Sequence, residues 1–449
     1  MWLEVDTTKK IDPQKVLIVR IFNTNKMKKI FPYRYRVLTL LFFLTLITYL
    51  DRVCISLVGV RIKSEFNLSN AQFGWVLGAF ALAYALFEIP SGMLGDRIGQ
   101  RKVFIRIVLW WSLFTALTGV TTGLLTLMIT RFLFGMGESG TYPNAAGTIS
   151  RWFPAAETSR SASSLIVGSN AGAAIAPLIV IPIAVAFGWR ATFFVNGSIG
   201  LIWVLICLFW FRNNPGEMKS ITNDEKYLIE KSRRFTNHKQ QFSWKAAFKN
   251  RSLWFLILSF HSCQWANYFF IAWLPIYLQE GRHFSENGMK IITSSLFIVG
   301  VIGALSAGFL CDWLVKKTGL RFGRRFIGIL SLSMICSLIF ILATAANNTI
   351  VVVSLIAANY FIPVNVIASF STCIDIGGDN AGTVAGIQNF FGQIGSFLMA
   401  IIFGKIVDLT HSFTIPLFIL SGVVFLGCLC WLFIDAGKPL IKQNLVMRI

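Results

Sequence analysis

Five ionisable residues in the first half of the chain lie inside long apolar stretches, where a charge is costly and therefore usually functional. They are Asp51, Arg52, Glu88, Arg131 and Glu138. An arginine in a low-dielectric cavity is the preferred fixed cation for a carboxylate, because its planar guanidinium donates two parallel hydrogen bonds. Carboxyl groups in the same cavity can bind and release protons, because burial disfavours their charged form. These residue types predict coupled movement of an organic anion and protons.

The spacing of these residues indicates which of them share a helix face. Arg131 and Glu138 are two helical turns apart, and Glu88 follows Tyr84 by about one turn, so each pair shares a face. Asp51 and Arg52 are adjacent and point about 100° apart, so they can face different neighbours. The alternative is that all five form internal pairs that only hold the helices together. Buried ion pairs are a poor source of stability, so we favour the functional interpretation.

The elements that must position these residues are membrane-spanning helices. The chain has 449 residues, of which 55% are hydrophobic and 14% charged, with a mean hydropathy of +0.66. Soluble domains carry about 25% charged residues, so this composition argues against a globular enzyme in water. Apolar blocks of roughly 20 residues can cross a bilayer as helices. We predict an all-α integral membrane protein with twelve transmembrane helices, near 37–60, 71–94, 103–120, 125–150, 161–186, 191–211, 253–278, 288–312, 326–345, 350–376, 381–409 and 414–434.

The net charge of +21 sets the orientation of the chain and does not indicate nucleic-acid binding. Of the 41 Lys and Arg residues, 33 fall in tails and loops on one side of the predicted spans and six on the other. Cytoplasmic loops carry such an excess, so both termini are predicted to be cytoplasmic. Residues 1–26 show no signal-peptide pattern, and they are either a disordered tail or a misassigned start before Met27.

The cysteines and histidines give no sign of a metal site or a cofactor. The eight Cys lie in or beside apolar spans without a CxxC pair, and the four His are widely spaced. In the seventh span, His261, Gln264 and Asn267 recur at helical spacing, so some of them are expected to line a cavity, whereas His261 fits a packed, hydrogen-bonded role better than a proton carrier. No catalytic triad lies in a span, so we predict that the protein is not an enzyme.

The long polar loop from Arg212 to Arg251 divides the chain into two sets of six spans. A repeated motif supports this division, because Gly92 and Asp96 after the second span recur as Gly308 and Asp312 after the eighth. Such a glycine allows close helix approach, and such an aspartate can pair with an arginine or a helix N-terminus in one conformation and release it in another. The predicted organisation is a cytoplasmic tail (1–36), an N-terminal six-helix bundle (37–211), a cytoplasmic linker (212–252), a C-terminal six-helix bundle (253–434) and a cytoplasmic tail (435–449).

The run from Gly92 to Lys102, with its degraded copy around Asp312, resembles the loop 2–3 signature of the major facilitator superfamily. The resemblance implies two pseudo-symmetric six-helix bundles, a substrate site between them near the membrane midplane, and alternating access by rocking. It also implies a conformational gate made of Gly92, Asp96, Arg97, Arg101, Lys102 and Asp312.

A closer resemblance, over roughly residues 34–435, is to the anion:cation symporter family of galactonate, glucarate and hexuronate transporters and vesicular glutamate and sialic-acid transporters. It is carried by Tyr49-Leu-Asp51-Arg52, by Tyr84 with Ile89-Pro90-Ser-Gly92, by Arg131-Phe-Leu-Phe-Gly135-Met-Gly-Glu138-Ser-Gly-Thr-Tyr-Pro143, by Trp152-Phe153-Pro154, by Trp273-Leu-Pro275-Ile-Tyr277-Leu278 and by Asn389-Phe390.

This resemblance implies roles for single residues. Asp51 and Glu138 would be the protonation sites, and Arg131 would tune Glu138. Arg52, with Tyr49 and Tyr84, would contact the substrate, and Asn389 would contact it from the second bundle; we add Gln264 as a candidate contact.

The chain departs from the family pattern at the part of the site that would read hydroxyl groups. Thr48 stands where the sugar-acid transporters have Asn, Ser169-Asn170 where a Gln is expected, and Phe370 where a Trp is common. Glu88 stands where an amide or apolar residue is expected, and it is either a third titrating group or, as we favour, a neutral hydrogen-bonded contact. An organic anion is therefore predicted more firmly than a sugar acid.

Together these observations predict a monomeric, proton-coupled symporter that imports an organic monocarboxylate or acidic sugar across a bacterial inner membrane. Two candidate acids predict two protons for each monoanion, and therefore electrogenic uptake. The alternative within transporters is a proton-driven efflux antiporter, because a proton site alone does not set direction. A sensor or a membrane-embedded enzyme is disfavoured, because the chain has no appended soluble domain.

Overall fold

The structure is a computed structural model that describes residues 32–154, 157–218, 220–232, 247, 249–378 and 381–438. Most of the predicted N-terminal tail, parts of the linker and the end of the C-terminal tail lie outside the described residues. Within them every regular element is a helix. The N-terminal half, before the linker, contains α2 (Tyr33–Leu57), α3 (Gly59–Phe66), α4 (Asn70–Ile98), α5 (Gln100–Thr118), α6 (Leu124–Glu138), α7 (Thr141–Trp152), α8 (Thr158–Phe187) and α9 (Trp189–Trp210).

The described part of the linker includes two short helices before the C-terminal half begins. They are η2 (Pro215–Glu217) and α10 (Asn223–Ser232). The C-terminal half contains α12 (Arg251–Tyr268), η3 (Phe269–Trp273), α13 (Leu274–Ile276), η4 (Tyr277–Gly281), α14 (Glu286–Thr318), α15 (Leu320–Thr344), α16 (Asn348–Gly377), α17 (Ala381–Thr410) and α18 (Thr414–Trp431).

Nine helices in the described part of the chain are long and apolar enough to cross a membrane, which makes this a multi-pass membrane protein. The other three predicted spans have physical reasons to fall short. The third, α5, carries Arg101, Lys102 and Arg106 within 19 residues. The fourth is broken between α6 and α7 at Ser139-Gly140, and the seventh is interrupted by the π-helical segments η3 and η4. The count of twelve spans stays a prediction.

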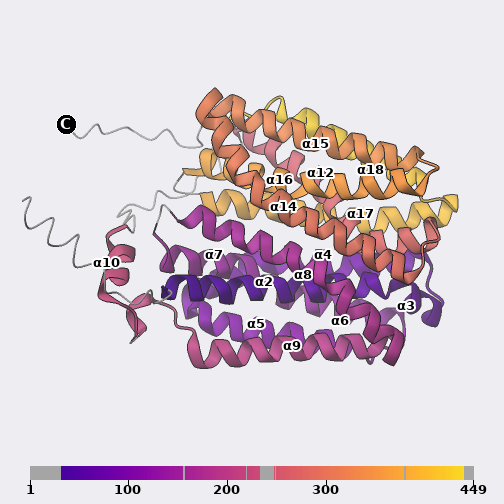
Figure 1. Ribbon diagram of the computed structural model, residues 1–449, viewed down its shortest axis with the longest axis horizontal. Coiled ribbons are helices and arrows are strands. Elements are labelled where there is room, and N and C mark those ends of the chain that lie inside the picture. The colour runs from indigo at the N-terminus through magenta and orange to yellow at the C-terminus, as the bar shows by residue number, and fades with distance from the viewer. Residues whose placement is uncertain are drawn as a thin grey trace, which may run out of the picture.

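The long helices run side by side along one direction, with the N-terminal half below and the C-terminal half above in Figure 1. The helix α2 begins at the left of the view, beside α10, and α3 lies at the right. On this same side, the end of the C-terminal half is bound to its beginning, because the backbone N–H of Asp435 donates to Ser252 Oγ at the start of α12 (3.1 Å). We call this side the termini end and the opposite side, which carries α3 and η4, the far end.

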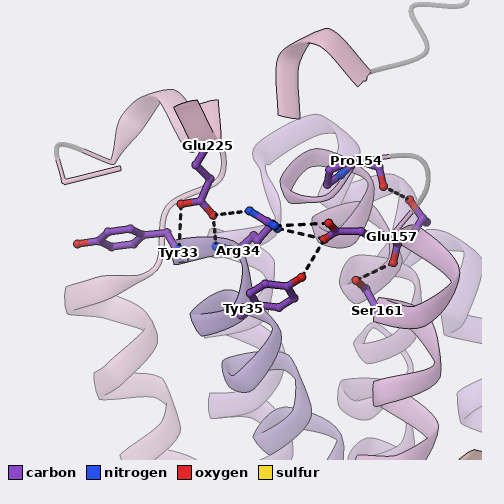
Figure 2. A network of polar contacts seen from close by, with 8 residues as sticks. Tyr33, Arg34, Tyr35, Pro154, Glu157, Ser161 and Glu225 are labelled. Carbon is purple, nitrogen blue, oxygen red and sulfur yellow. Dashed lines mark hydrogen bonds and ion pairs between the residues drawn. The ribbon is translucent and has the colours of Figure 1, made fainter. Parts of the chain in front are cut away.

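The linker is attached to the N-terminal half at the termini end (Figure 2). Glu225 of α10 accepts hydrogen bonds from the backbone N–H groups of Tyr33 and Arg34, at 3.1 and 3.0 Å. It therefore satisfies two free donors in the first turn of α2 and places a negative charge where the helix dipole is positive. The Arg34 side chain also pairs with Glu157 beside α8, at 3.0 Å. These contacts fix the start of α2, which carries the central residues of the site.

Glycines allow close packing of the helices that surround those residues. A Cβ on Gly172 of α8 would collide with the backbone of Leu46 in α2. A Cβ on Gly135 of α6 would lie 2.5 Å from the carbonyl oxygen of Phe80 in α4. Side chains at these positions would push the helices apart, so the glycines allow α8 to pack closely against α2 and α6 to pack closely against α4.

Candidate functional site

Arg52 is the centre of the buried polar cluster. Its Nε donates to Glu138 Oε1 at 2.9 Å and its Nη2 donates to the same oxygen, so that α2 and α6 are joined by an ion pair. Both side chains are buried, at 7% and 0% exposed. The guanidinium also lies over the rings of Tyr49, Phe80 and Tyr84, at 4.7, 4.8 and 5.1 Å from their centroids. Such contacts stabilise a cation where water is excluded.

Arg131, predicted to tune Glu138, lies deeper against aromatic rings. Its guanidinium is 4.5 Å from the Phe134 centroid and 5.2 Å from that of Phe80, so Phe80 contacts both arginines. Its Nε is buried without a hydrogen-bond partner among the described residues. It interacts with Glu138 electrostatically and not through a hydrogen bond. The tuning role stays a prediction.

Asp51 is buried in the cluster without an ion pair among the described residues. It is 1% exposed, and neither carboxylate oxygen finds a hydrogen-bond donor among the described residues. Its electrostatic neighbours are Glu138 and Arg131. The second oxygen of Glu138, Oε2, is also buried without a described partner. Two carboxyl groups therefore share one low-dielectric region with unused capacity to bind a proton.

Glu88 and Asn389 meet across the two halves of the molecule. The Asn389 amide of α17 donates to both carboxylate oxygens of Glu88 on α4, at 2.6 and 2.7 Å. Glu88 is 7% exposed. We favoured a neutral, hydrogen-bonded role for Glu88; the hydrogen bonds are present, with a partner from the opposite half, and the neutral state stays a prediction. Asn389, predicted to contact substrate, is bound here to a carboxylate of the protein itself.

The polar residues of the seventh span form hydrogen bonds with one another and with the neighbouring backbone. His261 Nδ1 is 2.9 Å from the carbonyl oxygen of Phe391, and its Nε2 accepts from Trp265 at 3.3 Å, which is the packed role predicted for it. Gln264 is 6% exposed and accepts from Asn267 at 3.2 Å, so its predicted substrate contact stays a prediction. Ser169, which stands at a departure from the family pattern, also has a partner. Its hydroxyl oxygen lies 2.5 Å from the hydroxyl oxygen of Tyr142.

Polar contacts between the halves, which the sequence pattern does not predict, close the far end. Arg61 forms a two-pronged ion pair with Glu286, with both N–O distances at 2.8 Å, and this raises the pKa of Arg61. Lys63 contacts Glu280 at 2.7 Å. Asp408 of α17 accepts from the backbone N–H of Ala71 at 2.7 Å, at the start of α4. We call these three contacts the far-end latch.

A weak sequence signal for the latch did exist. The predicted outer loops hold only six cations, and two of them, Arg61 and Lys63, are latch residues. Their acidic partners lie more than 200 positions away along the chain. Only the fold brings them together.

The residues of the predicted gate lie at the termini end and do not join the halves. Asp96 and Asp312 are exposed, and neither forms a hydrogen bond or ion pair with another described residue. Arg101 donates to the carbonyl of Leu208, and its backbone N–H donates to Asn213 at 2.9 Å, both in its own half or the adjoining linker. Gly92 packs near Pro143, whereas a Cβ on Gly308 would meet nothing, so the two copies differ in packing. The gate role stays a prediction for all six residues: Gly92, Asp96, Arg97, Arg101, Lys102 and Asp312.

A surface hollow of about 330 Å³ lies away from this cluster, between α4, α6 and α17. All the residues that line it are apolar, and none belongs to the predicted site: Trp75, Ala79, Leu82, Leu125, Met128, Ile129, Phe132, Leu133 and Phe397. Nothing there could neutralise an anion.

The amino-acid sequence is similar to those of known membrane transporters. Residues 41–400 match the model of the Major Facilitator Superfamily. A probable sulfoacetate transporter of Cupriavidus necator is 31% identical over 91% of this chain and 95% of its own length. A probable L-galactonate transporter of Escherichia coli is 30% identical over 88% of each chain.

The fold is also similar to that of a solved transporter. A bacterial homologue of the human lysosomal transporter Spinster, in an inward-facing and occupied conformation, superposes with a TM-score of 0.70 at 19% identity, covering 90% of this chain and 96% of that one. The family model covers most of the chain, and relatives at 30% identity or more are matched almost end to end. The chain is therefore a transporter, not an enzyme, and it belongs to the major facilitator superfamily, with relatives typical of its anion:cation symporter family.

Proposed function

We propose that the protein is a proton-coupled symporter of an organic anion. The observation that carries the proposal is the buried Arg52–Glu138 ion pair. Among the described residues, Glu138 is the one carboxylate that pairs with Arg52, and aromatic rings surround the rest of the guanidinium. A substrate carboxylate that binds Arg52 must take the place of Glu138.

This competition provides the coupling between anion and proton. When Glu138 binds a proton, its attraction to Arg52 falls, and the guanidinium can turn its donors to an incoming carboxylate. Asp51, which lacks donors of its own, would bind a second proton beside it. Loss of either proton restores a carboxylate next to the bound anion, and like-charge repulsion then promotes release. Tyr49 and Tyr84 would border the bound anion.

The transport cycle that we propose alternates between two states. Twelve spans would form two six-helix bundles (37–211 and 253–434) with the site between them. The far-end latch and the separated gate residues support a state that is open at the termini end. We place that end in the cytoplasm of a bacterium, because the excess of Lys and Arg lies there. In the other state the latch would open and the gate would close. We expect a monomer to be sufficient.

The relatives support an organic anion as the substrate. One is named for sulfoacetate and another for L-galactonate, and both are organic acids that ionise at neutral pH. Arg52 supplies the cation that any such substrate requires.

Thermal unfolding of the purified protein with a panel of organic anions tests the proposal, with Arg52→Ala beside the wild type. A ligand of the native state adds about 2.7 kcal/mol at 100 times its dissociation constant. Stabilisation of the wild type but not of the variant by one class of carboxylate supports the proposal.

Transport in liposomes supplies the second half of the test. We expect that anion to accumulate inside the liposomes when an imposed proton gradient drives protons inward. Equal stabilisation of both proteins, or anion movement against the proton flux, would overturn symport and favour efflux.

A further inference from the structure

The helices α2 and α9 lie antiparallel within the N-terminal half. Toward the termini end, the Trp203 indole of α9 donates to the carbonyl oxygen of Leu40 in α2, at 3.0 Å. Toward the far end, the Cys54 thiol of α2 donates to the hydroxyl oxygen of Thr192 in α9, at 3.5 Å. The two helices therefore run in opposite directions, and a residue between these contacts has a defined level on the opposite helix.

This register places Asp51 at the level of Asn196. Asp51 precedes Cys54 by three residues and Asn196 follows Thr192 by four, so both lie about one helical turn from that contact, toward the termini end. Residues three or four apart share a helix face, so Asp51 and Cys54 share one face of α2 and Thr192 and Asn196 share one face of α9. The Cys54 thiol interacts with both Asp51 and Asn196. These four side chains form one buried group.

The hydrogen-bonding atoms of Asp51 and Asn196 are unused. Asp51 is 1% exposed and Asn196 is 0% exposed. Neither the two oxygens of Asp51 nor the nitrogen and oxygen of the Asn196 amide form a regular hydrogen bond with another described residue. Buried polar groups in folded proteins nearly always have a partner, either another group of the protein or an ordered water. A carboxyl group and an amide at the same level of neighbouring helices can supply that partner to each other.

The charged groups around Asp51 do not take this role. Glu138 and Arg131 of α6 interact with Asp51 electrostatically, and neither forms a hydrogen bond with it in the described part of the chain. Glu138 directs one oxygen to Arg52. On α9 the charged residue is Arg190, at the far end, which pairs with Glu65 of α3, so it is directed away from Asp51. Asn196 is thus the neutral group on α9 that can complete the surroundings of Asp51.

We propose that Asn196 is a positioning residue that holds the Asp51 carboxyl group by a hydrogen bond, directly or through one bound water. An amide carries both a donor and an acceptor, so Asn196 can donate to the carboxylate and can accept from the protonated acid. It therefore serves both protonation states through which Asp51 passes in the proposed cycle. The inference rests on the proposed function, because that function makes Asp51 a proton-binding site.

The pH dependence of anion binding in Asn196→Leu gives the first test. Leucine has nearly the volume of asparagine and removes both hydrogen-bonding atoms. A hydrogen bond to a carboxylate is stronger than one to the neutral acid, so without it Asp51 should keep its proton to a higher pH. In the proposed function anion affinity falls as the pH rises, and we expect the midpoint of this fall to move up by about one pH unit, because a charge-assisted hydrogen bond is worth about tenfold in an equilibrium constant. Calorimetric titration across the pH range measures the midpoint, with the anion that stabilises the wild type in an Arg52-dependent manner.

Infrared difference spectroscopy between acid and neutral pH tests the carboxyl group itself and requires no anion. The carboxyl band that is missing in Asp51→Asn belongs to Asp51. It should move to higher frequency in Asn196→Leu, because a carboxyl C=O that accepts fewer hydrogen bonds absorbs at higher frequency. Ser198→Ala changes an exposed hydroxyl on the same helix and should leave both the band and the midpoint unchanged. Asn196→Ala, which removes the amide without adding bulk, replaces the leucine variant if that variant does not fold.

The outcomes separate this inference from the proposed function. An unchanged Asp51 band or an unchanged midpoint in Asn196→Leu would overturn the role of Asn196 and leave the symporter proposal intact. Thermal stability should then rise in the variant, because an unpaired buried amide has been removed. A midpoint shift of the same size when Asn196→Leu is added to Asp51→Asn would also overturn the role, because the effect would act through another group. If no anion binds the wild type in an Arg52-dependent manner, the proposed function fails, and the Asp51 band alone decides whether Asn196 holds the carboxyl group.

Discussion

At the scale of single residues, the chemistry depends on how few partners Arg52 has. Its guanidinium has five donors, one carboxylate and three aromatic rings around it. The carboxylate is the replaceable partner, because the rings contact the faces of the cation and leave its edges free. The sequence identified Arg52 and Glu138 as candidates, but it could not show that they pair, because they are 86 positions apart.

Arg52→Lys separates geometry from charge. Lysine keeps the positive charge that Glu138 requires but cannot donate two parallel hydrogen bonds to a carboxylate. Losing one charge-assisted hydrogen bond costs about 2 kcal/mol, so we expect anion affinity to fall about thirtyfold while the thermal stability without ligand changes little. Calorimetric titration with the anion that stabilises the wild type measures this. If the variant binds the anion as tightly as the wild type does, the two parallel hydrogen bonds of the guanidinium are not needed for binding.

Glu65 gives a pH prediction outside the membrane spans. The Trp189 indole and the Arg190 guanidinium, at 2.6 and 2.5 Å, hold the pKa of Glu65 below its usual range. A depressed pKa contributes stability above the unfolded pKa, and this stability is lost as the pH falls through the folded value. Glu65→Gln should therefore melt below the wild type at neutral pH, and the difference should begin to shrink below about pH 4.3 and vanish only once the pH has fallen through the folded pKa. The effect will be small, since the pair is substantially exposed. A constant difference at all pH values would disprove it.

At the scale of helices, hydropathy predicted where spans lie but not where they break. The fourth span divides between α6 and α7 immediately after Glu138. The seventh contains two π-helical segments at the far end. Apolar residues occur on both sides of each break, so a hydropathy pattern cannot detect them. Such irregular backbone places Glu138 at a helix end, where its carboxylate can turn toward Arg52.

The far-end latch gives a prediction at this scale. Glu286→Arg should place two cations together and favour the state in which the far end is open. Because the Arg61–Glu286 pair is about one-third exposed, we expect an effect of about 1 kcal/mol, or a fivefold shift in population. Hydrogen–deuterium exchange in α3 and η4 should rise. Arg61→Glu added to Glu286→Arg reverses the pair and should restore the wild-type exchange. If the double variant exchanges as fast as the single one, the pair does not hold the far end closed.

At the scale of the whole molecule, the polar contacts between described residues of the two halves lie between the far end and Glu88–Asn389. The sequence predicted the division of the chain at the linker, because only that loop is long and polar. It did not predict which end would be closed, because closure depends on contacts between residues hundreds of positions apart. The signature residues around Asp96, which the sequence made prominent, take no part in joining the halves in this state.

Electrogenic uptake is the prediction for the whole molecule. A monoanion moving with two protons carries one net positive charge, which gains about 2.3 kcal/mol per 100 mV. At a fixed pH gradient in liposomes, an inside-negative potential of about 100 mV should raise steady-state accumulation up to about fiftyfold. Equal accumulation with and without the potential would exclude the second proton.

The most direct test of the account is the pH dependence of anion binding in Glu138→Gln. If the substrate and Glu138 compete for Arg52, wild-type affinity should fall as the pH rises, by up to tenfold per pH unit. The neutral amide should bind the anion at least as tightly as the wild type does in acid, with a much weaker dependence on pH and no proton-driven accumulation. Glu65→Gln serves as the control and should follow the wild type. Loss of anion binding in Glu138→Gln, or a pH dependence as steep as that of the wild type, would contradict the competition on which the account rests.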